Sequence, residues 1–245
     1  MLAHRRISLE ASGVDYVAFS GHKVYAPFGA GALIGRRDWL DTCEPYVAGG
    51  GAVVQVTTDS VDWTTAPARH EGGTPNLVGA VALAEATEQL AALPEALVRE
   101  HEETLFHRLV DGLSGIDDID VARVWSDSAT PIGVATFRLR GTAPELVAAF
   151  LAAEHGVSRD GRFCAHPLLD RLAWGAGAVR ASIGVGTTIE DIDRLIAGLR
   201  AWTSGDIGAR YVQVDGVWVV DGDTRPVPQN LDLAALSTTL SACAS

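Results

Sequence analysis

Short apolar runs separated by glycine-rich turns define the start of the chain. Residues 15–19 (Asp-Tyr-Val-Ala-Phe) and 31–35 (Gly-Ala-Leu-Ile-Gly) have the length and composition of short buried strands. Gly and Pro cluster between them, in a loop that contains Lys23. The pattern predicts two strands joined by this loop.

The next part of the chain is irregular and then helical. No period holds over residues 41–76, where a run of three glycines at 49–51 and Pro67 indicate a long loop, which in a compact domain usually has a function. Residues 77–92 are rich in Ala, Leu and Glu and predict a helix. A second helix is expected from Pro94 to about residue 113.

Beyond Gly115 the pattern changes to short elements, which indicates a domain boundary there. Thr187 and Glu190 have the spacing of a capping box at the start of a helix with an apolar stripe. The other expected elements are strands at 119–125, 132–139 and 178–183, a helix at 144–156 and a hairpin at 211–220.

Composition and charge exclude two classes of partner. The chain has 245 residues, with 19 basic and 31 acidic side chains and a net charge of −12. Such a surface repels phosphate backbones and anionic lipids, so we expect neither nucleic-acid nor membrane binding. The three cysteines are too few and too scattered for a disulfide framework, which indicates a reducing compartment, the cytoplasm.

The strongest chemical signal is the run Ser20-Gly21-His22-Lys23, directly after the first predicted strand. Partial burial of an amine at a strand end would favour its neutral, nucleophilic form. Ser20 and His22 would flank a phosphate. A solvated lysine in a turn is the other reading that the residues alone allow.

Three segments, in order, resemble the class V aminotransferases, a family of pyridoxal-phosphate enzymes that includes the cysteine desulfurases. They are residues 15–31, with Ser-Gly-His-Lys at their centre, residues 71–76 (Glu-Gly-Gly-Thr-Pro-Asn) and residues 179–183 (Val-Arg-Ala-Ser-Ile). The likeness covers about residues 3–203.

The resemblance implies an α/β fold of the aspartate-aminotransferase type, pyridoxal-phosphate fold type I. Residues 1–114 would be the remnant of a large domain with a mainly parallel sheet, and residues 115–205 a small α+β domain. Residues 206–245 would add the hairpin and a mobile tail. The family places its pyridinium-binding aspartate and its ring-stacking residue upstream of the lysine, so we expect a fragment with little activity of its own.

The resemblance also implies roles for individual residues. Lys23 would form the Schiff base with pyridoxal 5'-phosphate, and Ser20 and His22 would contact its phosphate. Thr74 would contact the phosphate of the neighbouring subunit, because family members form homodimers with shared sites. Arg180 would hold the α-carboxylate of an amino-acid substrate in a bidentate pair.

Cys164 lies in a segment, residues 159–168, that resembles the sulfur-receiving segment of one branch of cysteine desulfurases. It would carry a persulfide taken from cysteine and pass it to an acceptor protein, and Arg159 and Arg162 would favour its thiolate. In an aminotransferase, epimerase or C–S lyase of the same family, Cys164 would only be structural. A truncated chain without catalysis, serving dimerisation or binding, is a further alternative.

Overall fold

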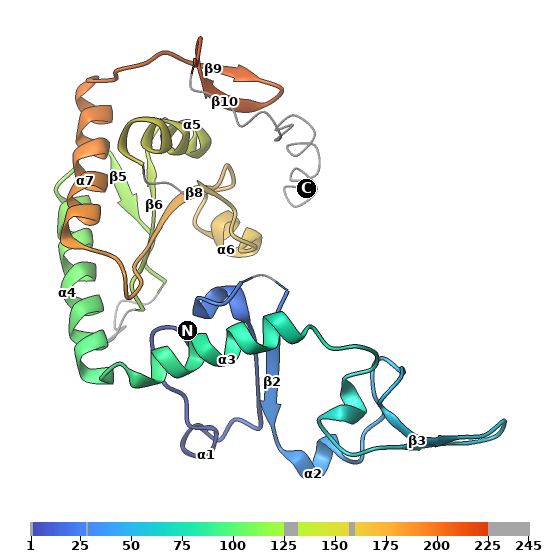
Figure 1. Ribbon diagram of the computed structural model, residues 1–245. Coiled ribbons are helices and arrows are strands. Elements are labelled where there is room, and N and C mark those ends of the chain that lie inside the picture. Colours follow the sequence, from blue (N-terminus) through green and yellow to red (C-terminus); the bar gives the residue numbers. More distant parts are fainter. Residues whose placement is uncertain (1, 28, 125–131, 157–159, 225–245) are drawn as a thin grey trace. The chain divides into compact units, whose positions relative to one another are not determined.

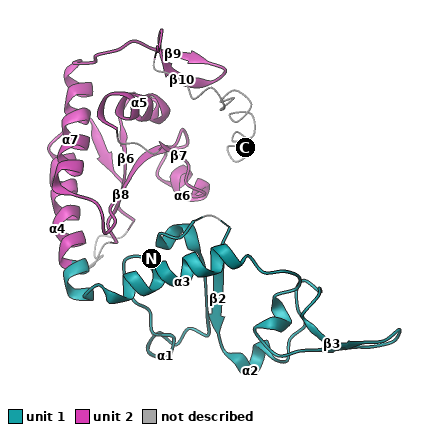
Figure 2. Cartoon of the chain, in the orientation of Figure 1, with its two compact units in different colours: residues 1–99 teal, residues 100–245 magenta. Residues whose placement is uncertain are grey.

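The computed structural model describes residues 2–27, 29–124, 132–156 and 160–224 (Figure 1). The chain divides into two compact units, residues 1–99 and 100–245 (Figure 2), and each is described by itself. The expected mobile tail, from residue 226 onward, lies outside the described residues.

Unit 1 is built on short strands and one long helix. Strands β1 (Tyr16–Ser20) and β2 (Gly31–Gly35) pair antiparallel, with Ser20 opposite Gly31. The other elements are α1 (Leu9–Ser12), the 3-10 turn η1 (Gly21–Val24), α2 (Arg37–Leu40), β3 (Val53–Val56), β4 (Val61–Trp63), η2 (Ala68–His70) and α3 (Leu77–Ala92). Strands β1 and β2 and the helix α3 therefore lie where the sequence pattern predicts them, whereas β3 and β4 lie in residues 41–76, for which the pattern predicts only a loop.

The expected parallel pairing is not present among the described strands of this unit. β1 pairs with β2, and β3 with β4, all antiparallel. Residues 21–30 are too few for the crossover of about a dozen or more residues that adjacent parallel strands require. A short connection therefore fixes the antiparallel hairpin around the lysine turn.

Several apolar side chains of β2 and α3 are more exposed than the sequence pattern predicts. Leu33 and Ile34 of β2 are 57% and 52% exposed, and Leu77 and Val81 of α3 are 70% and 62% exposed. Strand β2 is thus not the buried strand that its composition indicates. Within the described residues, these side chains form no part of a core.

Unit 2 packs helices against an antiparallel four-stranded sheet of order β5-β6-β8-β7. Its strands are β5 (Ile119–Val121), β6 (Val134–Leu139), β7 (Asp160–Gly161) and β8 (Ala178–Ser182). Its helices are α4 (Glu95–Ser114, of which residues 100–114 belong to this unit), α5 (Pro144–Phe150), the π-helical turn η3 (Leu151–His155), α6 (His166–Arg171) and α7 (Ile189–Ser204). Leu109, Phe137, Phe150 and Leu199 are fully buried in its core. The hairpin β9 (Tyr211–Val214) and β10 (Val217–Val220) follows α7, as expected.

The structure divides the chain at residue 99 rather than at residue 114. The reason is α4, whose apolar side chains Leu105, Leu109 and Leu113 belong to the core of unit 2. These apolar side chains lie in residues 100–114, the part of α4 that belongs to unit 2.

Two local expectations change by a few residues. The capping box at the start of α7 is formed by Thr188 and Asp191, one residue later than the pair that the sequence indicates. The expected strand 119–125 is described as strand only to Val121, and residues 125–131 lie outside the described part. Over the described residues, no helix is both long enough and apolar enough to cross a membrane.

Candidate functional site

The lysine turn is a compact loop closed by backbone hydrogen bonds. The Gly21 amide donates to the Ala30 carbonyl at 2.7 Å, and the Ala26 amide donates to the Gly21 carbonyl at 3.0 Å. A methyl group on Gly21 would lie 3.0 Å from the Ala30 oxygen, so glycine permits this close approach. The loop therefore presents Lys23 on a turn fixed at both ends.

Lys23 is the only lysine among the 245 residues, beside 18 arginines. This count can be read from the sequence alone, and it marks Lys23 independently of the motif around it. In the structure Lys23 and His22 are exposed and Ser20 is half-buried at the end of β1. The described residues of this chain thus leave the Lys23 side chain exposed, which agrees with the solvated lysine that the sequence also allows.

Thr74 is exposed in the loop before α3, in unit 1 with Lys23. The loop is held by the glycine run at 49–51, since the Gly73 amide donates to the Gly50 carbonyl at 2.9 Å. A methyl group on Gly49 would lie 2.9 Å from the carbonyl carbon of Gly72, too close for any other residue type. The glycines that mark an irregular loop in the sequence thus allow two backbone segments to touch.

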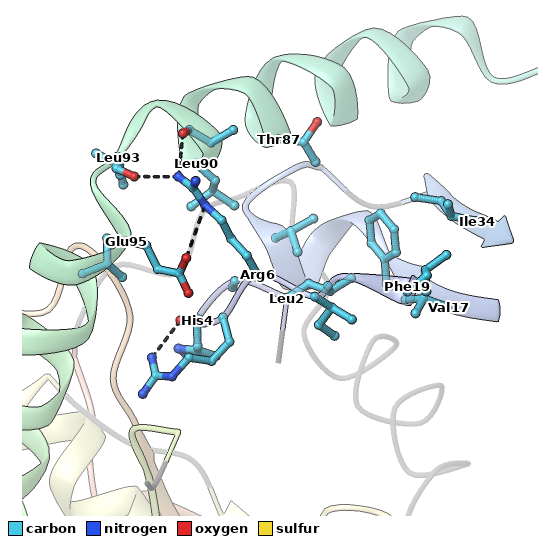
Figure 3. Close-up of a pocket in the computed structure, with 17 residues that line it drawn as sticks. Leu2, His4, Arg6, Val17, Phe19, Ile34, Thr87, Leu90, Leu93 and Glu95 are labelled. Carbon is cyan, nitrogen blue, oxygen red and sulfur yellow. Dashed lines mark hydrogen bonds and ion pairs between the residues drawn. The ribbon is translucent and has the colours of Figure 1, made fainter. Parts of the chain in front are cut away.

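A pocket of about 390 Å³ lies beside the lysine turn in unit 1 (Figure 3). Phe19 and Val24, on either side of the Ser20–Lys23 segment, line it together with apolar side chains of β1, β2 and the end of α3. Arg6 donates to the Ala91 and Leu93 carbonyls at 2.7 and 2.9 Å, which satisfies the C-terminal end of α3. Ser20, His22 and Lys23 do not line this pocket, so it is separate from the predicted site residues.

Arg180 and Cys164 lie close together in the fold of unit 2. Arg180 is opposite Thr136 in the pairing of β8 with β6. Its guanidinium carbon is 4.7 Å from the ring centroid of Phe163, the residue before Cys164. Cys164 is an exposed free thiol. The structure thus brings the predicted carboxylate-binding residue into contact with the residue that precedes the predicted sulfur-carrying cysteine.

The backbone at Cys164 has an uncommon conformation. Phe163 and Cys164 have φ angles of 52° and 57°, the left-handed region that few non-glycine residues occupy. The turn is closed by the Ala165 amide, which donates to the Arg162 carbonyl at 2.8 Å. Arg159 lies outside the described residues, and His166 begins α6.

Other charges occupy the same face of the sheet as Arg180. Arg138, two residues from Thr136 on β6, lies 5.0 Å from the Trp174 ring and donates to Asp120 at 3.0 Å. The hydrogen bond from Arg138, followed by one from Arg140, lowers the pKa of the Asp120 carboxyl. Two arginine–aromatic contacts therefore lie on this face, and Arg138 is already paired with a carboxylate.

The candidate site thus consists of a lysine turn at the end of β1 in unit 1 and, in unit 2, an arginine that contacts the aromatic residue next to an exposed thiol. Residues 1–195 match the aminotransferase class-V family, and the chain belongs to that family. The proteins that the chain resembles include cysteine desulfurases.

The curated relatives include a probable cysteine desulfurase of Vibrio cholerae, 36% identical over 199 residues, or 81% of this chain and 48% of the relative. A second, from Mycobacterium leprae, is 36% identical over 198 residues, 80% of this chain and 46% of the relative. The chain therefore spans about half the length of the curated relatives it matches.

Two solved structures of cysteine desulfurases have a similar fold. The cysteine desulfurase CsdA of Escherichia coli has a TM-score of 0.75 and 30% identity, with 82% of this chain and 49% of that chain covered. The apo cysteine desulfurase of Thermococcus onnurineus has a TM-score of 0.77 and 30% identity, with 83% and 50% covered. The expected fold, pyridoxal-phosphate fold type I, is confirmed, and the chain contains about half of it.

Proposed function

We propose that this chain carries the lysine and substrate-binding part of a cysteine desulfurase that uses pyridoxal 5'-phosphate. The observation that supports this most is the single lysine of the chain, placed in the Ser-Gly-His-Lys turn directly after β1. Several relatives and solved structures are cysteine desulfurases, which supports cysteine as the proposed substrate.

The donor set of the turn fits the cofactor's chemistry. Ser20, His22 and Lys23 follow one another at the end of β1, and they offer a hydroxyl, an imidazole and a primary amine. An amine attacks an aldehyde carbon, and the other two groups bind a phosphate. When bound, the cofactor supplies an electron sink for the bond changes at the substrate's α-carbon.

The residues of the chain then have distinct tasks. Nζ of Lys23 attaches the cofactor and moves the proton from the α-carbon of the substrate. Arg180 holds the α-carboxylate with its planar fork, and Phe163 supports that guanidinium from one side.

Cys164 would complete the sulfur transfer. Its thiolate attacks the sulfur of cysteine, the carbon–sulfur bond breaks, and a sulfur–sulfur bond forms. The substrate carbon takes up one proton, so cysteine and the enzyme thiol give alanine and an enzyme persulfide without a net oxidant. The exposure of Cys164 supports this role, since a persulfide must be reachable by an acceptor protein.

The assembly and setting are part of the same proposal. The proposed assembly is a homodimer, in which Thr74 of one subunit contacts the phosphate in the other. Exposed apolar side chains of unit 1, such as Tyr46 and Val54, support this assembly. A cytoplasmic setting is supported by the free thiols of Cys43 and Cys164.

The test of the function is product analysis. The purified chain is incubated with the cofactor and cysteine, and alanine, pyruvate and protein-bound persulfide are measured. Slow formation of alanine and persulfide in equal amounts is the expected result, because we expect a chain that spans about half the length of its relatives to have little activity of its own. Pyruvate would favour a C–S lyase instead, and neither product would favour a non-catalytic binding role.

A further inference from the structure

Asn76 makes two side-chain hydrogen bonds to segments that lie far apart in the sequence. Its Oδ1 accepts from the Gly79 amide at 3.0 Å and caps the start of α3. Its Nδ2 donates to the carbonyl of Gly29 at 2.8 Å, in the loop that follows Lys23. A backbone amide only donates and a carbonyl only accepts, so this orientation of the side-chain amide alone satisfies both partners.

The packing around Gly79 extends this link. Gly79 is buried, and a methyl group there would lie 2.4 Å from Nδ2 of Asn76 and 3.0 Å from the Ala30 side chain. The start of α3 therefore lies against the end of the lysine loop, and glycine at 79 makes room for the Asn76 side chain.

The link continues to the lysine turn itself. Ala30, next to Gly29, accepts the 2.7 Å hydrogen bond from the Gly21 amide that closes the loop. Gly21 in turn accepts the Ala26 amide, and Lys23 lies between these two residues in η1. A short chain of contacts thus runs from Asn76 through Gly29, Ala30 and Gly21 to the turn that presents Lys23.

We infer that Asn76 is a positioning residue, which fixes the loop of residues 21–30 in the conformation that presents Lys23 to the cofactor. The hydrogen bond from its Nδ2 is to Gly29, so it acts through Gly29 and Ala30. The statement about the cofactor rests on the proposed function, whereas the link between Asn76 and the loop belongs to this chain alone.

Two substitutions separate the two hydrogen bonds. Asn76→Asp keeps an acceptor for the Gly79 amide and removes the donor to Gly29. Asn76→Ser does the same without adding a charge, since serine is also a good N-cap but is too short to reach Gly29. Asn76→Ala removes both bonds. Thr188→Ala, which removes the N-cap of the equally long helix α7 in unit 2, is the matched control.

The first measurement is amide hydrogen exchange in the cofactor-free chain. In the Asp and Ser variants we expect the Gly21 and Ala26 amides to exchange about fivefold faster, as the loss of one hydrogen bond allows, with the Gly79 amide unchanged. Thr188→Ala should leave all three unchanged. Unaltered exchange at Gly21 and Ala26 in both variants would overturn the link; if one variant does not fold, the other decides.

The second measurement is labelling of Lys23 by limiting pyridoxal phosphate and borohydride, with the terminal amine of the same chain as internal reference. The Asp and Ser variants should label Lys23 several-fold less, with the terminal amine unchanged. Equal labelling despite a loosened loop would overturn the positioning role. If the unmodified chain does not label Lys23 above its terminal amine, the proposed function fails, and the exchange result still decides whether Asn76 holds the loop.

Discussion

The guanidinium of Arg180 lies against the ring of Phe163, with 4.7 Å between the guanidinium carbon and the ring centroid. Phe163 directly precedes Cys164, whose thiol is exposed. The residue that Arg180 contacts is therefore the sequence neighbour of the predicted sulfur carrier. Cation–π contacts of this kind hold a guanidinium in place without using its hydrogen-bond donors. The contact with Phe163 therefore fixes one face of the Arg180 guanidinium.

Phe163→Leu should weaken substrate binding, because the leucine side chain cannot support the guanidinium by its π face. A partly exposed cation–π contact is worth about 0.5–1 kcal/mol, so we expect KM for cysteine to rise about two- to fivefold with kcat less affected. Steady-state kinetics of the active protein measure this. An unchanged KM would show that the ring has no part in orienting Arg180.

Arg180→Lys should raise KM about tenfold or more and lower kcat less, since a point charge replaces a bidentate fork. Arg138→Lys is the matched control, because Arg138 lies on the same sheet face and contacts Trp174, yet it is paired with Asp120. The control should alter stability and leave KM near that of the unmodified protein. Equal effects of the two substitutions would remove Arg180 from the substrate site.

Cys164→Ser should abolish the protein persulfide and leave cofactor binding intact, because the two processes use different side chains. Cys43→Ser is the control: Cys43 is half-buried, and its sulfur is 3.8 Å from Nε2 of His70. Persulfide is measured by mass spectrometry after addition of cysteine. Persistent sulfur transfer by the Cys164→Ser variant would favour the C–S lyase.

The carboxyl of Asp120 makes a pH-dependent contribution to stability. Arg138 and Arg140 lower its pKa in the folded state, so its contribution is present above the unfolded pKa of about 3.9 and is lost as the pH falls through that value to the folded pKa. Asp120→Asn should therefore lower Tm by a few degrees at pH 7. Thermal unfolding across pH 3–7 should show the two proteins converging below about pH 4, and a constant difference would contradict this.

The local elements of the fold could be predicted from the sequence, whereas their pairing and grouping could not. The hairpin at 211–220 and the helices from Leu77 onward follow from turn residues and from helical periodicity. The domain boundary did not, because the apolar side chains of α4 are buried in a core formed with helices and strands that follow it in sequence. The resemblance implies a mainly parallel sheet for the large domain, but it does not fix the direction of each strand pair, and the short loop between β1 and β2 makes this pair antiparallel.

The site residues show the same limit. Motifs identified Lys23, Thr74, Arg180 and Cys164 in isolation. They could not show that Phe163 contacts Arg180 or that Asn76 joins the lysine loop to α3, since both contacts depend on how distant segments pack. The count of a single lysine, by contrast, could be read from the sequence directly.

The most direct test of the central claim uses that single lysine. The purified chain is incubated with pyridoxal phosphate, reduced with borohydride and digested, and the labelled peptide is identified by mass spectrometry, with Lys23→Arg as the control. The account predicts label on Lys23, accompanied by visible absorbance before reduction, and loss of both in the control. Label confined to the terminal amine, or equal labelling of the Lys23→Arg protein, would contradict it.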